Sequence, residues 1–178
     1  MQLKAGQEAK TFKVEDIASL SIDLHNYKGK KILLSFYRYA ACPLCNLRVH
    51  QLITNYDYFK SKNLQLLAFF ESPRESILKY VGNQNCPFPL IGDPNREIYK
   101  MYGIESSWLR FAISMLTRLN SLIKAAVKGF YPGKMEGEIA LLPADFLINT
   151  DFTIHTAYYG KDIGDHLSIN KIKEWLEK

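Results

Sequence analysis

The sequence RYAACPLC, residues 38–45, joins an apolar run to a helical pattern and decides the fold. The run before it, ILLSFY at 32–37, is typical of a buried strand. From Cys45 onward, apolar residues recur at spacings of four and three, which predicts a helix with one buried face. The members of that face are Val49, Leu52, Tyr56 and Phe59. Two cysteines therefore lie where a strand passes into a helix.

Cys42 falls at the expected start of this helix, and Pro43 follows in the first turn, where the missing N–H of a proline is harmless. A thiolate at this place faces unpaired backbone N–H groups and the positive end of the helix dipole. Such a setting lowers a cysteine pKa from about 8.5 to roughly 3.5–7.5. Cys42 is therefore the candidate attacking thiol. Cys45, three residues further along the same helix, is the candidate resolving thiol.

Other uses of the cysteine pair stay open. A Cys-x-x-Cys pair can be half of a zinc site, with His50 and Cys86 as the remaining ligands. The two cysteines can also be inert members of the core. Redox chemistry is favoured, because the chain has no second Cys-x-x-Cys pair and no His-x-x-x-His pair. Cys86 lies between turn residues and is interpreted as a lone thiol.

Length and composition are those of an ordinary globular protein, with 178 residues, 47% apolar and 23% charged, which suits one domain over residues 1–178. Three cysteines are too few for a disulfide framework. The N-terminus lacks the apolar core of a signal peptide, and no stretch is long and uncharged enough to span a bilayer. We expect a cytoplasmic protein that holds no cofactor and no metal.

The net charge of +5 comes from one segment. No acidic residue lies between Ser106 and Met135, and the remaining 18 cations of the chain balance its 18 acids. The five cations of the segment are Arg110, Arg118, Lys124, Lys128 and Lys134. No platform that interleaves basic and aromatic residues is apparent, so nucleic acid is not an expected partner.

The rest of the chain alternates strand and helix signals. After a polar N-terminal extension, 1–30, residues 64–70 predict a second buried strand. Ser72 and Pro73 then predict the capped start of a helix that ends at Gly82. This order is typical of a parallel sheet with helices on its faces.

The last third returns to strands. Residues 141–149 and 152–159 predict a β-hairpin. A terminal helix is predicted from about Ser168, with Ile172 and Trp175 facing inward.

Residues 106–128 predict one basic amphipathic helix, which with the following loop forms an insertion over about 106–134. Its cations fall on one side. The apolar residues of the other side are Trp108, Ala112, Met115, Leu119, Leu122 and Ala126. We expect this apolar side to pack on the domain or on a second subunit of a homodimer, with the basic side in solvent. Contact with a membrane surface is the less favoured use.

The order of these pieces resembles the thioredoxin-like superfamily, and within it the alkyl hydroperoxide reductase/thiol-specific antioxidant (peroxiredoxin) family. The resemblance rests on residues 3–12, 27–31, 87–90, 93–97, 102–103 and 146–149, together with the position of Cys42. It implies an α/β, thioredoxin-like fold: a central mixed β-sheet flanked by helices, with an N-terminal extension and the inserted basic helix. It also implies a site at the carboxyl ends of the strands.

The chain departs from the peroxiredoxin pattern at three positions. Peroxiredoxins carry a proline and a threonine or serine where this chain has Ser35 and Tyr39, and an arginine where it has Pro143. Most of the groups that bind a peroxide in that family are therefore replaced. Arg38, four residues before Cys42, is the candidate replacement cation, unless it faces solvent or pairs with an acid.

Pro143 instead resembles the cis-proline that faces the cysteine pair in thioredoxins. That resemblance makes Pro143 and Leu142 candidate substrate-binding residues, and Tyr39 is added as their neighbour before Cys42. The buried acid that thioredoxins keep before the first cysteine is absent, since Phe36 occupies its place. Asp145 is interpreted as facing solvent, with a role as a nearby base as the alternative.

Together these features indicate a thiol-based oxidoreductase that cycles a Cys42/Cys45 dithiol and disulfide, with Arg38 as the third catalytic candidate. Its substrates are expected to be peroxides or protein disulfides, and its reductant a thioredoxin- or glutathione-type thiol. The alternative is a binding module without catalysis, in which the cysteines are structural or hold zinc.

Overall fold

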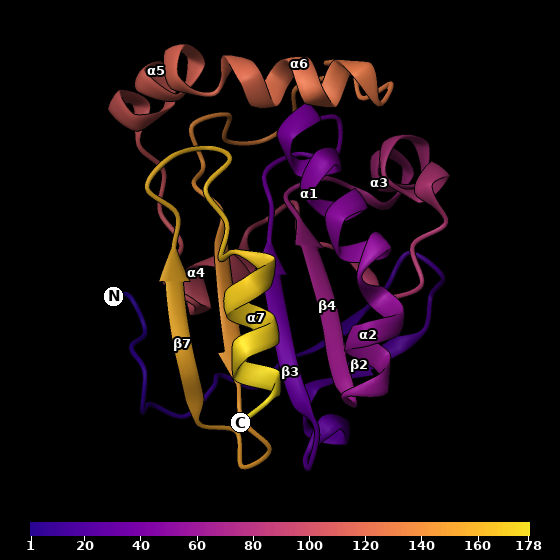
Figure 1. Cartoon of the computed structure of the whole chain (residues 1–178), viewed down its shortest axis with the longest axis vertical. Coiled ribbons are helices and arrows are strands. Elements are labelled where there is room, and N and C mark those ends of the chain that lie inside the picture. The colour runs from indigo at the N-terminus through magenta and orange to yellow at the C-terminus, as the bar shows by residue number, and fades with distance from the viewer.

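The computed structural model describes all 178 residues, and its centre is a five-stranded sheet in the order β5-β4-β3-β6-β7 (Figure 1). The strands are β3 (Lys31–Phe36), β4 (Leu64–Phe70), β5 (Leu90–Gly92), β6 (Ala144–Ile148) and β7 (Ile154–Tyr159). β3 pairs parallel with β4 and antiparallel with β6. The expected mixed sheet is therefore confirmed.

β3 is the middle strand of the sheet, so its side chains are buried on both faces. Leu33 belongs to one hydrophobic cluster, whereas Leu34 and Phe36 belong to the other. The first cluster is covered by α1 (Pro43–Thr54), α2 (Tyr56–Ser61), α3 (Arg74–Tyr80) and α7 (Ile169–Leu176). The N-terminal segment and α4 (Glu97–Met101) cover the second.

The N-terminal segment contributes a small hairpin of its own, formed by β1 (Lys13–Glu15) and β2 (Ser21–Asp23). A short 3-10 helix, η1 (Leu24–Tyr27), leads from it into β3. A second, η2 (Gly82–Gln84), follows α3 close to the predicted helix end at Gly82.

The C-terminal predictions are confirmed. β6 and β7 form the antiparallel hairpin. The side chain of Ser168 caps α7 by accepting a hydrogen bond from the backbone N–H of Lys171 at 3.3 Å. Ile172 and Trp175 are buried against the sheet.

Two helix boundaries differ from the prediction. The single helix predicted to run from Pro43 through Phe59 is interrupted at Asn55, which separates α1 from α2. Ser72 does not cap α3, which has no side-chain cap. The Ser72 hydroxyl instead accepts a hydrogen bond from the backbone N–H of Ala40 at 2.9 Å and donates one to Glu136 at 2.8 Å. It therefore holds the segment before Cys42 in place.

The insertion is also two helices, α5 (Trp108–Thr117) and α6 (Leu119–Val127), which lie end to end across the top of the molecule in Figure 1, with α6 packed against α1. The prediction that the whole apolar side packs on the domain was wrong: of its six members only Leu122 and Ala126 are half-buried, and the other four are exposed. Trp108, for example, is 60% exposed, whereas Ser114 and Ala125 are buried. No helix of the chain is both long and apolar enough to cross a membrane.

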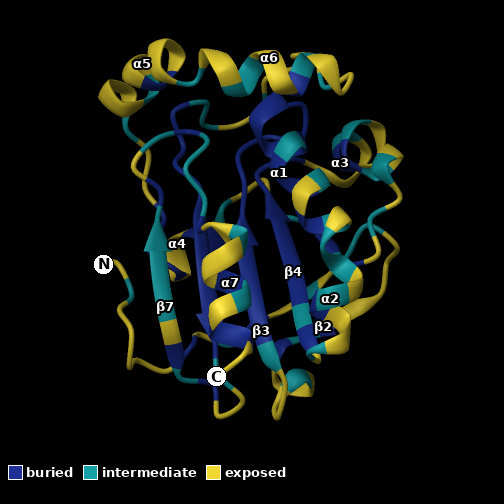
Figure 2. Cartoon of the chain, viewed as in Figure 1, coloured by how far each residue is buried: buried dark blue, intermediate teal, exposed yellow.

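Two polar contacts help to set the orientation of α5 and α6 on the domain. The Ser114 hydroxyl accepts a hydrogen bond from the backbone N–H of Ile163 at 3.2 Å. Arg118, at the junction of the two helices, pairs with the Asp162 carboxylate at 2.7 Å. Phe111 and Leu122 also pack against the hydrophobic core, so the face of the insertion that meets the domain is both polar and apolar. The opposite side of α5 and α6 remains exposed (Figure 2).

Candidate active site

The strand-to-helix junction places Cys42 at the N-cap of α1, as predicted. Its Sγ accepts a hydrogen bond from the backbone N–H of Cys45 at 3.4 Å, and Pro43 occupies the first helical turn. Cys42 and Cys45 are both free thiols, and each is only 1% exposed. The attacking and resolving candidates are therefore brought together beneath the surface.

Arg38 is buried and directed at Cys42, not at solvent or an acid. Its Nη1 lies 3.6 Å from Cys42 Sγ, and its Nη2 donates a hydrogen bond to the Ile139 carbonyl. Its guanidinium carbon lies 5.1 Å from the centre of the Tyr39 ring and 5.4 Å from that of Phe111. The Tyr39 ring, in the loop before α1, and the Phe111 ring, on α5, thus help to hold a cation beside the sulfur.

The two thiols differ in acidity. Burial alone would raise the pKa of Cys42. Three contacts outweigh burial: a hydrogen bond from the Cys45 thiol, the charge of Arg38, and the N–H groups at the helix start. Together they lower the pKa of Cys42 to about 6. Burial raises the pKa of Cys45, and the hydrogen bond to Cys42 and the negative charge there raise it further. At neutral pH, Cys42 is therefore the thiolate and Cys45 the thiol.

The candidate substrate-binding residues lie in the interior. Every peptide bond in the chain is trans, so the likeness of Pro143 to a cis-proline was wrong. The Pro143 carbonyl accepts a hydrogen bond from Gly160 N–H at 2.8 Å, and the Leu142 N–H donates to the Glu105 carbonyl at 3.1 Å. These backbone groups are therefore already paired within the protein and do not form an open edge for a substrate strand. Tyr39 is also buried, and that burial raises its pKa to about 12.

Asp145 does not face solvent, and this interpretation is corrected. Its carboxylate is fully buried and accepts hydrogen bonds from the Ser35 hydroxyl at 2.6 Å and the Leu167 N–H at 2.7 Å. His166 Nδ1 lies 3.0 Å away. Burial alone would raise the pKa of this carboxyl, but His166, Arg48 and Ser35 outweigh it and hold the pKa below its usual value.

Sequence reasoning missed this cluster because its members are far apart in the chain. His166 comes 21 residues after Asp145, and no local spacing connects them. One signal was present in the sequence: Asp145 is the only charged residue in the apolar run at 141–148, which contains the buried strand β6. A carboxylate in that setting requires partners.

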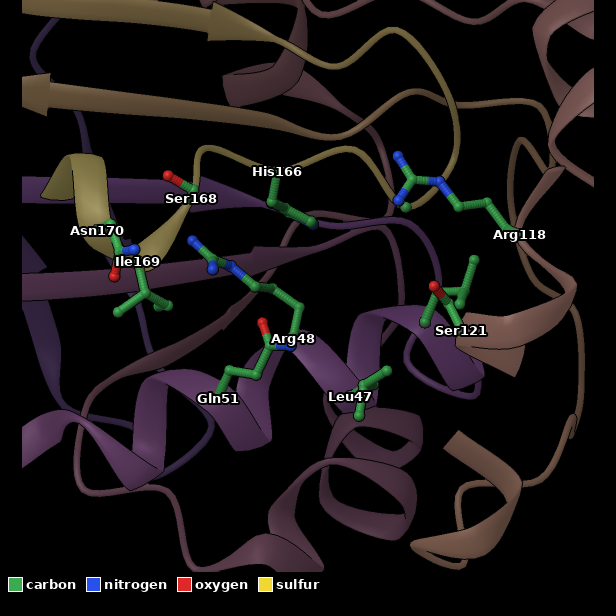
Figure 3. Close-up of a pocket in the computed structure, with 11 residues that line it drawn as sticks. Leu47, Arg48, Gln51, Arg118, Ser121, His166, Ser168, Ile169 and Asn170 are labelled. Carbon is green, nitrogen blue, oxygen red and sulfur yellow. The ribbon is translucent and has the colours of Figure 1, made fainter. Parts of the chain in front are cut away.

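A polar cavity of about 370 Å³ lies beside α1 (Figure 3). Figure 3 shows Arg48 rising from α1, Arg118 from the junction of α5 and α6, and Ser168 and Asn170 at the start of α7. The cations of this cavity already have partners in the protein. Arg48 Nη2 donates to the Leu167 carbonyl at 2.7 Å, and Arg118 forms its ion pair with Asp162.

Cys86 and His50, the other two candidate zinc ligands, do not join Cys42 and Cys45 in a metal site. Cys86 is half-buried, and burial raises its pKa to about 12. His50 lies 3.2 Å from Lys128 Nζ. No group of three or more His, Cys, Asp and Glu side chains in the chain is arranged to hold a metal ion. The zinc arrangement of Cys42, Cys45, His50 and Cys86 is therefore not assembled.

Comparison with known proteins points to one family. A family model described as the AhpC/TSA family matches residues 5–157. A Buchnera aphidicola protein with a peroxiredoxin name is 29% identical over 102 residues, which are 57% of this chain and 65% of that protein. Peroxiredoxin Bcp of Escherichia coli is 25% identical over 125 residues, which are 69% and 80% of the two chains. The chain thus spans just under two thirds of the Buchnera protein.

The chain is also similar to proteins named as thiol-disulfide oxidoreductases. The thiol-disulfide oxidoreductase ResA of Halalkalibacterium halodurans is 26% identical over 102 residues, 57% of each protein. Among solved structures, peroxidoxin BcpB of Mycobacterium tuberculosis superimposes with a TM-score of 0.69 at 13% identity, covering 99% of this chain and 96% of that one. The thioredoxin domain of a Bacteroides vulgatus thiol-disulfide oxidoreductase gives 0.58 at 16% identity, covering 98% and 99%. These structures confirm the thioredoxin-like fold.

Proposed function

The chain belongs to the AhpC/TSA family, and from that membership we propose that it is a thiol oxidoreductase that cycles Cys42 and Cys45 between dithiol and disulfide. One observation carries the proposal. Cys42 Sγ receives the Cys45 N–H at the start of α1 and lies 3.6 Å from Arg38 Nη1. With a pKa lowered to about 6, Cys42 is mostly ionised at neutral pH, and the thiolate is the reactive form.

The first proposed substrate is a hydroperoxide. The Cys42 thiolate attacks one peroxide oxygen, the O–O bond breaks, and the second oxygen leaves as an alcohol or water after taking up a proton. Cys42 is thereby oxidised by two electrons to a sulfenic acid. The Arg38 guanidinium, beside the sulfur, is placed to stabilise negative charge as it develops on the leaving oxygen.

Resolution uses the second cysteine. The Cys45 sulfur attacks the sulfur of the Cys42 sulfenic acid, hydroxide leaves and takes the thiol proton as water, and a disulfide forms. A thioredoxin- or glutathione-type reductant then returns two electrons and restores both thiols. The raised pKa of Cys45 suits this order, because Cys45 remains a protonated thiol while Cys42 reacts first.

Burial favours a small substrate over a protein disulfide. Attack on a disulfide requires the thiolate to approach one sulfur directly. Cys42 is only 1% exposed, so the sulfur of a protein disulfide could reach it only if the surrounding chain opened. A hydroperoxide needs a much smaller opening than a protein strand does.

Protein disulfide exchange is the second candidate. The observation in its favour is the Cys-x-x-Cys spacing, which places a resolving thiol one helical turn from the attacking one. In this scheme Cys42 attacks the substrate disulfide, one substrate thiol leaves, and Cys45 releases the second from the mixed disulfide. Both candidates share the same sulfurs and the same reductant class. We propose a cytoplasmic location, since such thiols keep cysteines reduced there.

The deciding experiment follows thiol loss in fully reduced, metal-free protein mixed with limiting hydrogen peroxide in a stopped-flow instrument. Alkylation and mass mapping then assign the modified cysteines. Loss of Cys42 orders of magnitude faster than free cysteine, with recovery of a Cys42–Cys45 disulfide, supports the peroxidase. Loss no faster than free cysteine removes peroxide as substrate.

The same protein is then mixed with an oxidised model protein disulfide. Rapid formation of the Cys42–Cys45 disulfide in this mixture alone supports disulfide exchange. Cys42→Ser is the control for both reactions. If Cys42→Ser loses its fold, or if wild-type protein reacts with neither oxidant, the alternative of a non-catalytic binding module is preferred.

A further inference from the structure

The outward side of α5 and α6 is an apolar surface with no cover in the protein. Figure 2 shows exposed positions along the outer side of both helices. Leu116 and Val127 are each 83% exposed. The exposed apolar side chains of this surface, here called the outer stripe, are Trp108, Leu109, Ile113, Leu116, Leu119, Ile123 and Val127. Contiguous apolar patches of this kind on a soluble domain mark interaction surfaces.

The outer stripe continues through the helix junction. Leu109, Ile113 and Leu116 are spaced by four and three residues and occupy one side of α5, and Ile123 and Val127, four residues apart, share one side of α6. All five are exposed, so the stripe runs along both helices of the α5–α6 rod. The opposite side is fixed to the domain by Ser114 and Arg118. The rod therefore cannot turn its apolar side inward without breaking a buried hydrogen bond and an ion pair.

Positive charge accompanies the outer stripe. No acidic residue lies between Ser106 and Met135. Arg118 and Lys134 are paired with Asp162 and Glu136. The cations of the segment that have no carboxylate partner are Arg110, Lys124 and Lys128, and all three are exposed.

The apolar stripe and its flanking cations together favour a lipid surface over a second copy of the chain as the binding partner. In a two-fold dimer, the outer stripe would meet its own copy, and the flanking cations would face a segment that contains no acid. An anionic lipid surface offers apolar depth to the stripe and negative charge to the cations. We propose that the α5–α6 rod lies in the plane of an anionic lipid surface, with the outer stripe in the headgroup and acyl boundary.

The rod would then hold the cysteine site close to the lipid. Phe111 of α5 lies on the inward side, where its ring meets the Arg38 guanidinium at 5.4 Å. One layer of helix therefore separates the outer stripe from the site. Lipid binding needs no redox chemistry, so this proposal is tested separately from the proposed function.

The two tryptophans of the chain provide a direct readout. Trp108 is 60% exposed on the outer stripe, whereas Trp175 is 3% exposed in the core. Protein is mixed with vesicles of phosphatidylcholine alone or of phosphatidylcholine and phosphatidylglycerol at two to one. We expect a blue shift of tryptophan emission and cosedimentation with the anionic vesicles, both weakened by added salt. Trp108→Phe should lose the blue shift.

A matched pair of variants tests the stripe itself. Leu116→Glu should weaken binding to the anionic vesicles by about tenfold or more, because it removes a leucine that inserts into the lipid and adds a charge that the anionic lipid repels. Leu20→Glu, the same change at an exposed leucine outside the insertion, should bind like wild type. Both side chains are solvent-exposed, so circular dichroism should show unchanged folding.

Three results would overturn the proposal: no cosedimentation with either vesicle, equal binding to neutral and anionic vesicles, or equal binding of Leu116→Glu and wild type. Sedimentation velocity without lipid identifies the alternative occupant. A concentration-dependent dimer that Leu116→Glu abolishes, in protein that does not bind vesicles, would assign the outer stripe to a second copy of the chain.

Discussion

Ser35 and Asp145 face each other across the β3–β6 ladder, and the Ser35 hydroxyl donates a 2.6 Å hydrogen bond to the Asp145 carboxylate inside the sheet. His166 and the Leu167 N–H approach the same carboxylate from the segment that enters α7. One buried charge therefore connects β3, the strand that leads to Cys42, with the C-terminal part of the chain.

Asp145→Asn should destabilise the fold by about 3–5 kcal/mol at neutral pH, because it leaves the partners of a buried charge uncompensated. The folded pKa of this carboxyl is lowered, so its contribution is present above the unfolded value of about 3.9 and is lost as pH falls through the lower folded value. Urea unfolding across pH measures this. Asp57→Asn, at an exposed aspartate, is the control. If the difference in unfolding free energy between Asp145→Asn and wild type stayed constant in acid, the stabilising role of the Asp145 carboxylate would be contradicted.

Arg38→Gln should raise the Cys42 pKa by about 1–3 units, since an adjacent cation favours the thiolate by that amount. Alkylation by iodoacetamide between about pH 5 and 9, which brackets the lowered pKa of about 6 and the unperturbed value of about 8.5, should show the midpoint moving upward. Arg110→Gln, an exposed arginine on α5, serves as the matched control. An unchanged midpoint in Arg38→Gln would mean that the Cys45 thiol and the helix start set the acidity of Cys42 without Arg38.

Cys45→Ser and Cys45→Ala should differ in their effect on Cys42. Serine keeps a hydroxyl that can donate to the thiolate, whereas alanine removes the donor, so the Cys42 pKa should rise more in Cys45→Ala. Ultraviolet absorbance of the thiolate during a pH titration measures the difference. Both variants should stop at the Cys42 sulfenic acid after peroxide, and Cys86→Ser should still form the disulfide.

Glu136→Ala should expose Cys42 more often. Glu136 accepts hydrogen bonds from Ser72 at 2.8 Å and Ser76 at 2.7 Å, and these tie the end of the insertion to α3. The loss of about 1 kcal/mol of anchoring should speed Cys42 alkylation about fivefold at a pH where the thiol is fully ionised. Glu75→Ala, at an exposed position of α3, should leave the rate unchanged, and equal rates in both variants would refute the anchoring role.

The strands, the C-terminal hairpin and the cysteine junction were predictable because their signals are local. Mostly apolar runs mark β3 and β4, and Ser168 caps α7 as its position before the helix indicates. The place of Cys42 follows from adjacent strand and helix patterns.

The other features depend on contacts between distant segments. Arg38 finds its place through Phe111 and the Ile139 carbonyl, roughly seventy and one hundred residues further along the chain. The orientation of α5 and α6 is set by Asp162 and Ile163, which no helical period within the insertion encodes. A hydrophobic pattern identifies an apolar side but does not show whether a distant polar partner turns that side outward.

The buried Arg38 also affects the redox balance of the pair. In the reduced protein its charge is matched by the Cys42 thiolate, whereas in the disulfide no thiolate remains and the carbonyl of Ile139 is its remaining polar partner. A buried cation without its counter-ion is unfavourable. The dithiol form is therefore stabilised relative to the disulfide, which raises the reduction potential. The oxidised protein should accept electrons readily from its reductant and spend most of its time with both sulfurs reduced.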